Sequence, residues 1–285
     1  MLKQRVITAV LLLLILLPAL FYSDPAPFCL IAMALIAAAA WEWCRLNGYG
    51  QRFSLIAAAG CVAVLAVAWW AGLLVRHLPA LWLFAGGAWV LLGAWALHGG
   101  VVAWTALPRI IRLLVGLAAL LLAWLALAQA RVIGINFLLS ILVLVWVADI
   151  SAYFAGRAFG GRVCRQKLAP GISPGKSWEG VWGGMLGVVV LAFVWRWIDQ
   201  AWVVSVPSLF GHVGDGGVLL LLIAVIFMAA MSVVGDLFES LVKRSAGVKD
   251  SSGLLPGHGG VLDRVDALLP TLPLAMMLYS MGVTQ

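Results

Sequence analysis

The sequence predicts an all-α membrane protein, a polytopic bundle of about nine transmembrane helices. Of its 285 residues, 65% are hydrophobic and only 10% are charged, whereas soluble domains usually carry about 25% charged residues. Apolar runs recur at a length of about 20 residues, which crosses a hydrocarbon core of about 30 Å as a helix. A soluble fold with this composition would expose large apolar patches and aggregate.

Charged residues, glycines and prolines separate the apolar runs and so define the expected spans. The first run follows Lys3 and Arg5, as in a signal peptide, but it lacks a convincing small-residue cleavage site, so we expect a retained span. The nine runs cover residues 6–23, 27–45, 54–75, 79–98, 112–130, 133–155, 179–198, 217–236 and 265–283.

Basic residues indicate the orientation, because cytoplasmic loops are enriched in lysine and arginine. With nine spans and the N-terminus inside, only Arg76, Arg131 and Arg196 of the 18 basic residues fall on the outer side. The sequence therefore predicts a cytoplasmic N-terminus and an outer C-terminus. Membrane lipids account for basic residues at membrane edges, so the net charge of +7 does not indicate a nucleic-acid partner.

Acidic residues divide the chain into two regions. Of the eleven acidic residues, only Asp24 and Glu42 precede Asp149. We therefore expect residues 1–131 to form a transmembrane scaffold of about five helices. Residues 132–285 are expected to form a catalytic region of about four helices, with cytoplasmic loops at 157–178 and 237–264. The short loops are typical of an integral protein of the bacterial inner membrane.

The first candidate stretch is ADISAYFAGRAFGGR at residues 148–162. Asp149, Tyr153 and Arg157 are four residues apart and share one helix face. Asp149 lies within hydrocarbon depth, where a carboxylate needs a partner and is a functional candidate. The alternative is an ion pair between Asp149 and Arg157 that only orders the helix end.

The second stretch is KLAPGISPGKSWEG at residues 167–180. A Walker loop requires GxxxxGK[ST], but Pro170 stands where its first glycine would be, and no preceding β-strand is expected. Lys176 and Ser177 at a helix start could still bind phosphate, because free backbone N–H groups, the helix dipole and the ammonium group favour an anion. The alternative is an ordinary basic loop that enters a helix.

The third stretch begins with GDLFESLVKR at residues 235–244. Its polar side chains follow helical spacing, so they occupy one face of a helix that leaves the membrane. They are Asp236, Glu239, Ser240 and Lys243.

A glycine-rich loop follows, with His258 in the sequence GHGG, and then Asp263 and Asp266 at the start of the last span. Carboxylates from two helices at one membrane edge suit Mg²⁺, whereas no set of cysteines and histidines offers a zinc site. His258 is expected to bind phosphate or to order the loop. The alternative for the whole stretch is a loop stabilised by salt bridges.

Metal-binding carboxylates surrounded by lysine, arginine and backbone donors indicate phosphoryl or nucleotidyl transfer. This chemistry requires a metal to neutralise phosphate charge and cations to hold the leaving group. No activated serine or cysteine nucleophile is evident, and none is needed when an anionic phosphate attacks.

Three segments together resemble the signature of the phosphatidate cytidylyltransferases, also called CDP-diacylglycerol synthases. They are SLVKR at 240–244, KD at 249–250 and PGHGGVLDRVD at 256–266. Residues 149–160 and 173–180 also resemble stretches of this family. The chain departs from some members at Gly175, where they carry lysine, and at Ser177, where they carry threonine.

The resemblance implies a reaction of CTP with phosphatidic acid that gives CDP-diacylglycerol and pyrophosphate with Mg²⁺. A second cation and a homodimer are further expectations. On this reading Asp236 and Asp263 bind the metal, and Asp250 and Asp266 tune the metal or the neighbouring cations. The triphosphate or the lipid phosphate would contact Lys176, Lys243, Arg244, Lys249 and Arg264. Further substrate contacts are expected from Asp149, Ser173, Ser177, Ser240, His258, Gly259 and Gly260.

Two other functions fit parts of the pattern. A transporter of a phosphorylated solute would use the same charges along a pathway, although these charges gather on one side. A CTP-dependent polyprenol kinase would phosphorylate an alcohol and would require a general base.

Overall fold

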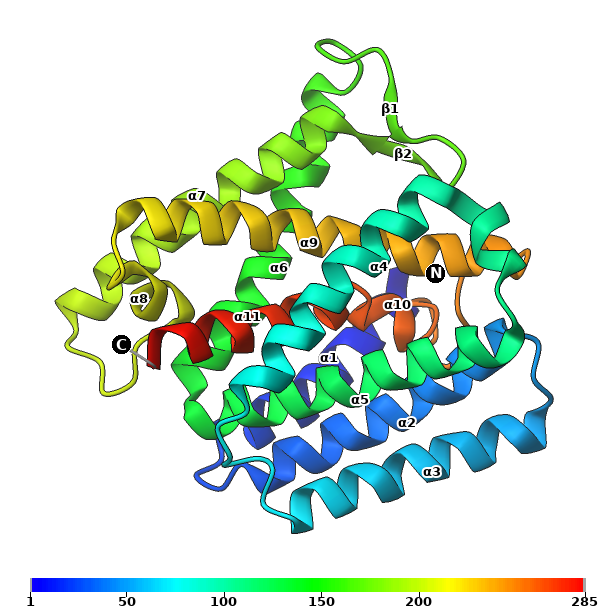
Figure 1. The fold of residues 1–285 in the computed structure, drawn as a ribbon. Coiled ribbons are helices and arrows are strands. Elements are labelled where there is room, and N and C mark those ends of the chain that lie inside the picture. The colour runs from blue at the N-terminus through cyan, green and yellow to red at the C-terminus, as the bar shows by residue number, and fades with distance from the viewer. Residues whose placement is uncertain (1, 284–285) are drawn as a thin grey trace.

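The structure, a computed structural model that describes residues 2–283, is a bundle of long helices with a small two-stranded hairpin (Figure 1). Among these residues, eight segments are long and apolar enough to cross a membrane: α2 to α7, α9 and Leu262–Gly282. A shorter apolar helix, Val6–Phe21, lies within α1. The predicted all-α membrane bundle is confirmed.

The elements are α1 (Leu2–Phe21), α2 (Ala26–Leu46), α3 (Gln51–Trp70), α4 (Pro79–Ala106), α5 (Arg109–Ile133), α6 (Ile135–Phe159), β1 (Lys167–Ala169), β2 (Ser173–Ser177), α7 (Trp178–Ala201), α8 (Leu209–Gly214), α9 (Val218–Ser245), α10 (Leu262–Val265) and α11 (Leu268–Val283).

Several boundaries differ from the sequence prediction. α4 continues to Ala106 and bends at Gly100, whose φ of 62° is outside the helical range. α8 was not predicted, because six residues are fewer than two helical turns and give little periodic signal. The last span is divided into α10 and α11. α9 extends to Ser245, so the irregular part of the predicted loop is confined to residues 246–261.

The hairpin of β1 and β2 corrects the expectation that no strand precedes Lys176. The two strands are antiparallel, with Lys167 opposite Ser177. Proline and glycine at positions 170 and 171 supply the turn, and buried Ile172 anchors it against the core. The hairpin brings Lys176 into contact with Asp236 of the helix α9.

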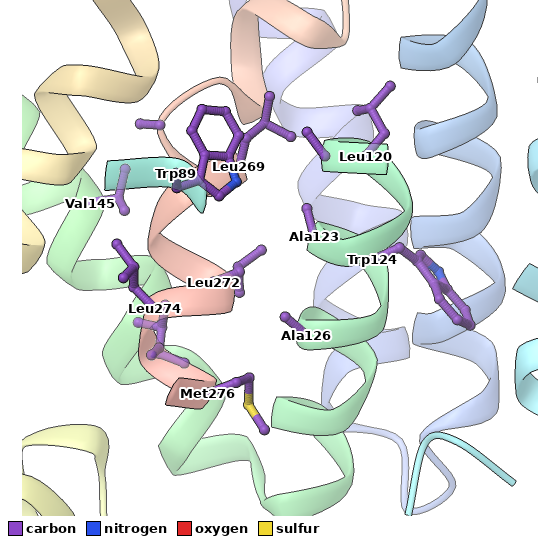
Figure 2. Packing of buried hydrophobic residues seen from close by; sticks show 14 of the residues in the cluster. Trp89, Leu120, Ala123, Trp124, Ala126, Val145, Leu269, Leu272, Leu274 and Met276 are labelled. Atoms are coloured by element: carbon purple, nitrogen blue, oxygen red, sulfur yellow. The ribbon is translucent and has the colours of Figure 1, made fainter. Parts of the chain in front are cut away.

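The apolar core lies between the helices of the N-terminal and C-terminal regions. Figure 2 shows side chains of α5 and α11 facing one another, among them Ala123, Leu269 and Leu272. Burial of such side chains supplies the packing that holds membrane helices together. The two regions expected from the sequence therefore share one core.

An aromatic cluster lies beside the polar end of α9. The rings of Trp43 on α2 and Phe238 on α9 are stacked, with centroids 6.2 Å apart. Trp104 contacts both rings edge-on. The indole nitrogen of Trp43 also donates to the carbonyl of Arg112 at 3.0 Å. These contacts fix α2 against α9 next to the charged residues of both helices.

The two ends of the bundle contain different parts of the chain. Near the start of α1, the Thr8 hydroxyl donates to the carbonyl of Pro256 at 3.0 Å, which places α1 beside the glycine-rich loop. At the other end, Gly282 of α11 lies against His212 of α8. The first and last helices thus begin and end at opposite ends of the bundle. The side of the membrane that each end faces stays a prediction.

Candidate active site

A pocket of about 410 Å³ brings together residues from all three candidate stretches. It opens between α6, the end of β2, the start of α7 and α9. Four of the residues expected at the site line it. These are Asp149, Lys176, Ser177 and Asp236. Because polar groups converge here from segments far apart in sequence, this pocket is the candidate active site.

Asp236 is the point where the hairpin meets α9. Its Oδ2 atom forms an ion pair with the ammonium group of Lys176. Its Oδ1 atom accepts a hydrogen bond from the Ser240 hydroxyl at 3.3 Å, one helical turn later. Ser177, the next residue after Lys176, accepts from the Gly180 N–H at 3.2 Å and caps α7. The second candidate stretch therefore binds the third directly.

Asp149 and Arg157 do not form the ion pair that was the alternative to a functional role for Asp149. Arg157 instead donates to the Tyr153 hydroxyl at 3.2 Å, and the four ion pairs of the described residues do not include Asp149. All three side chains line the pocket. The Arg157 guanidinium is thus available to a ligand at the pocket.

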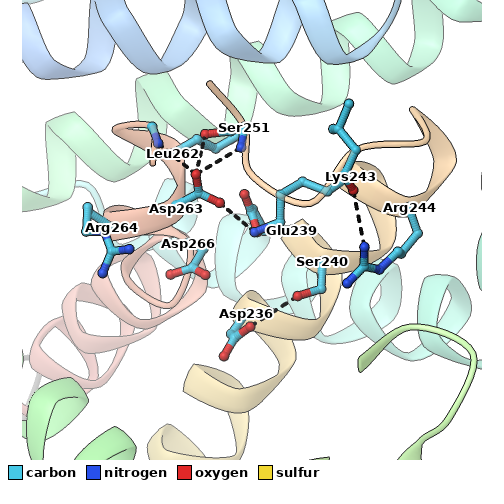
Figure 3. Close-up of polar contacts among 12 residues, drawn as sticks. Asp236, Glu239, Ser240, Lys243, Arg244, Ser251, Leu262, Asp263, Arg264 and Asp266 are labelled. Atoms are coloured by element: carbon cyan, nitrogen blue, oxygen red, sulfur yellow. Dashed lines mark hydrogen bonds and ion pairs between the residues drawn. The ribbon is translucent and has the colours of Figure 1, made fainter. Parts of the chain in front are cut away.

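Asp263 is the centre of a second polar cluster next to the pocket (Figure 3). Its Oδ1 accepts from the Lys243 ammonium at 2.5 Å, and the same ammonium lies 2.5 Å from Glu239. Its Oδ2 accepts from the Ser251 N–H at 2.9 Å, the Ser251 hydroxyl at 2.9 Å and the Gly260 N–H at 2.8 Å. Asp263 therefore connects α9 to both ends of the glycine-rich loop.

The two clusters meet where α9 packs against α10. A Cβ atom on Gly235 would lie only 2.6 Å from the carbonyl oxygen of Asp266, so a larger residue would separate the helices. Asp149 and Asp236 line the same pocket, and the backbone of Asp266 lies beside Gly235, the residue before Asp236. Like charges repel strongly where the dielectric constant is low, so this group favours binding of a cation.

Two predicted phosphate-binding residues bind backbone carbonyls in the structure. Arg244 donates to the carbonyl of Ile172 at 3.3 Å and thereby holds the hairpin turn. Arg264 donates to the carbonyl of His258 at 3.1 and 2.6 Å. These contacts order the hairpin and the loop, and a role for either arginine toward phosphate stays a prediction.

The GHGG segment curls over Asp263. Gly259, with φ of 84°, places its Cα where a Cβ would approach Asp263 Oδ2 to 2.8 Å. Its carbonyl accepts from the Leu255 N–H at 2.8 Å. The Nδ1 atom of His258 is buried and has no hydrogen-bond partner in the described part of the chain. The GHGG segment therefore packs against the Asp263 carboxylate and does not extend into solvent.

Three predicted residues neither line the pocket nor form a side-chain hydrogen bond with either cluster among residues 2–283. Lys249 and Asp250 are exposed, and no hydrogen bond or ion pair joins their side chains to residues 2–283. Ser173 lies at the far end of β2 and does not line the pocket. A substrate contact from these residues stays a prediction.

Asp236 and Asp263 are the residues that the sequence predicts as ligands of Mg²⁺, and this role stays a prediction. Within the described residues, no three His, Cys, Asp or Glu side chains are grouped as ligands of one metal ion. Mg²⁺ often takes only one or two protein carboxylates and completes its shell with water and phosphate. Asp236 and Asp263 each already bind a lysine ammonium. Both carboxylates therefore already bind a cation in the structure, namely a lysine ammonium group.

Two buried glutamates at the site were not singled out from the sequence. Glu179 on α7 accepts from the N–H groups of Gly161, Val163 and Cys164, and so orders the loop after α6. Glu42 on α2 binds the glycine-rich loop from the opposite side. Glu42 could have been recognised from the sequence as a lone carboxylate within a predicted apolar span, because such a group needs partners.

Comparison with known proteins identifies the class of protein that this fold and site represent. Residues 3–281 match the model of the cytidylyltransferase family. The chain belongs to this family and is a nucleotidyltransferase.

Individual relatives extend the comparison across the full length. The phosphatidate cytidylyltransferase of Pseudomonas aeruginosa is 42% identical, with 99% of this chain and 98% of that protein covered. The phosphatidate cytidylyltransferase of Haemophilus influenzae is 36% identical, with 98% of this chain and 99% of that protein covered. A shorter match, 41% identical over 142 residues, links the chain to the phosphatidate cytidylyltransferase of Thermotoga maritima. The family resemblance indicated by the sequence motifs is confirmed.

Proposed function

We propose that this membrane enzyme transfers CMP from CTP to phosphatidic acid and so makes CDP-diacylglycerol and pyrophosphate. The observation that carries this proposal is the direct contact between Lys176 and Asp236 in a pocket that also contains Asp149. An ammonium group and carboxylates in one pocket supply the charges that a nucleotide and a phosphate ligand require. The names of the full-length relatives supply the substrate class.

The proposed reaction is a substitution at the α-phosphorus of CTP. An oxygen of the lipid phosphate forms a bond to this phosphorus, while the bond to the oxygen that bridges to the β-phosphate breaks. Pyrophosphate leaves with the electron pair of that bond. The attacking phosphate is already an anion, so the site needs no residue to remove a proton. A polyprenol kinase would need one, because its acceptor is an alcohol.

Lys176 and Arg157, which line the pocket, would hold the two anionic substrates. The ammonium group of Lys176 would need to move little to exchange its partner Asp236 for a phosphate oxygen, because both partners would lie at the pocket. Arg157, which donates to the Tyr153 hydroxyl at the pocket, would bind the phosphate of the lipid. The exposed rings of Tyr153 and Phe154 on the same turn of α6 provide an apolar surface for its acyl chains.

Asp236 and Asp263 would hold Mg²⁺, which neutralises phosphate charge when it is bound. Lys243 would keep Asp263 oriented before the metal binds. We also propose that the site faces the cytoplasm of a bacterium, at the inner membrane. CTP is available on that side, and the positions of the basic residues favour the same orientation.

Product analysis tests the proposal. Purified protein is incubated with phosphatidic acid, CTP and Mg²⁺, and the lipid and aqueous products are identified by mass spectrometry. CDP-diacylglycerol and pyrophosphate in equal amounts are expected. A phosphorylated lipid alcohol with CDP, formed when a polyprenol is supplied, would favour the kinase. Uptake of a phosphorylated solute into sealed vesicles without chemical conversion would favour the transporter.

A further inference from the structure

Glu42 is a buried carboxylate near the C-terminal end of α2, and it binds a loop more than 200 residues away in sequence. Its exposed fraction is 0%. Its Oε1 accepts from the Ser252 hydroxyl at 2.5 Å and the Val261 N–H at 2.9 Å. Its Oε2 accepts from the Ser251 hydroxyl at 3.2 Å and the Leu262 N–H at 2.7 Å. Each oxygen therefore has two donors, and the single proton of one of them, the Ser251 hydroxyl, is shared with Asp263.

All four donors come from one segment, residues 251–262. No lysine or arginine forms an ion pair with Glu42 among the described residues. Burying a carboxylate is costly unless hydrogen bonds compensate for the lost water, and hydrogen bonds to a charged acceptor are stronger than neutral ones. Hydrogen bonds from the glycine-rich loop thus replace those that the Glu42 carboxylate would form with water. In return, Glu42 holds both ends of the loop.

The same loop holds Asp263 on its other side. The Ser251 hydroxyl lies between the two carboxylates, 3.2 Å from Glu42 and 2.9 Å from Asp263. The backbone at Gly260 passes between them as well. A Cβ there would lie 2.0 Å from the Ser251 hydroxyl and 2.4 Å from Glu42, while its N–H donates to Asp263. Displacement of the loop from Glu42 would therefore displace donors from Asp263.

We propose that Glu42 is a positioning residue for the reaction: it fixes residues 251–262 and through them the orientation of Asp263. Glu42 does not line the pocket and would not touch either substrate. The effect on catalysis rests on the proposed function, whereas the effect on the loop does not. The scaffold region would then contribute to the active site directly.

The most informative variant is Glu42→Gln, which keeps the shape of the side chain. In either orientation of the amide, its NH₂ group faces a backbone N–H, from Val261 or from Leu262, and two donors cannot bond to each other. Asp199→Asn is the matched control. Asp199 is also buried and accepts from the N–H and hydroxyl of Ser208, but it lies beside α8 at the other end of the bundle.

Hydrogen exchange measured by mass spectrometry on the intact protein reports the loop directly. We expect Glu42→Gln to accelerate exchange in residues 251–262 roughly 10-fold or more, because buried donors lose their acceptor. Exchange in the buried part of α9 should stay at the wild-type rate. Asp199→Asn should leave the loop at the wild-type rate.

Kinetics separate positioning from general stability. Glu42→Gln should raise the Mg²⁺ concentration that gives half-maximal CMP transfer and lower kcat by roughly 10-fold or more. Glu42→Asp keeps the charge and should recover part of both losses. Wild-type exchange of the loop in Glu42→Gln would overturn the proposal. Uniformly faster exchange in every helix would overturn it too, because Glu42 would then stabilise only the fold.

A second variant covers the case in which Glu42→Gln does not fold. Ser252→Ala removes the 2.5 Å hydrogen bond from a partly exposed position and should accelerate exchange at 251–262 by roughly 3-fold or more. Unchanged exchange in this variant would contradict the proposal. A wild-type protein that makes no CDP-lipid would refute the proposed function instead, and the exchange results would still decide the role of Glu42 in the loop.

Discussion

The ammonium group of Lys243 on α9 lies 2.5 Å from Asp263 on α10, and so joins the end of one membrane helix to the start of the next. The same ammonium is the cationic partner of Glu239, whose side chain is only 1% exposed. Removing the cation would leave two carboxylates facing each other in a site of low dielectric constant.

Lys243→Met is therefore expected to lower CMP transfer by about 100-fold or more and to lower the melting temperature. Both effects are measured on protein in the same detergent. Lys167→Met, which removes an exposed ammonium from β1, serves as the control and should stay close to wild type. Near wild-type turnover in folded Lys243→Met would contradict the role given to this ion pair.

The contact between Lys176 and Asp236 predicts coupling between the two residues. Lys176→Met and Asp236→Asn should each lower kcat/KM by about 100-fold or more. The double variant should lose less than the product of the two single losses, since residues in one ion pair do not act independently. Losses that multiply fully would show that the two side chains act separately.

Arg157 and Tyr153 predict a specific effect on the lipid substrate. Arg157→Gln should raise the KM for phosphatidic acid by about 10-fold and change the KM for CTP much less, because the guanidinium contributes charge-assisted hydrogen bonds to a phosphate. Tyr153→Phe removes only the hydroxyl that accepts from Arg157 and should have a smaller effect. An increase confined to the KM for CTP would assign Arg157 to the nucleotide instead.

Chelation tests the proposed metal. Excess EDTA should abolish CMP transfer, and added Mg²⁺ should restore it, because phosphate charge must be neutralised for the reaction. In Asp263→Asn the Mg²⁺ concentration for half-maximal activity should rise by roughly 10-fold or more. Full turnover in EDTA would exclude the metal role of both Asp236 and Asp263.

The sequence predicted those parts of the molecule that depend on composition and local spacing. Apolar runs predicted the spans because crossing a membrane imposes their length. Asp149 and Asp236 were recognisable because a carboxylate in a span is costly and needs partners. Both line the same pocket in the structure.

Contacts between distant segments could not be read from the sequence in the same way. The bond between Lys176 and Asp236 depends on how the hairpin folds back onto α9. The donors to Glu42 come from residues 209 to 220 positions later in the chain. The hydrogen bond from Arg244 to the carbonyl of Ile172 also depends on the position of the hairpin turn.

The most direct test of the proposed reaction follows two labels in CTP. The protein is incubated with phosphatidic acid, Mg²⁺ and CTP labelled at either the α- or the γ-phosphate, and the lipid phase is counted. We predict that the α-label enters the lipid, that the γ-label leaves as pyrophosphate, and that Asp263→Asn slows both at the Mg²⁺ concentration that suffices for the wild type. Entry of the γ-label into lipid, with the α-label retained in CDP, would contradict CMP transfer and establish a kinase.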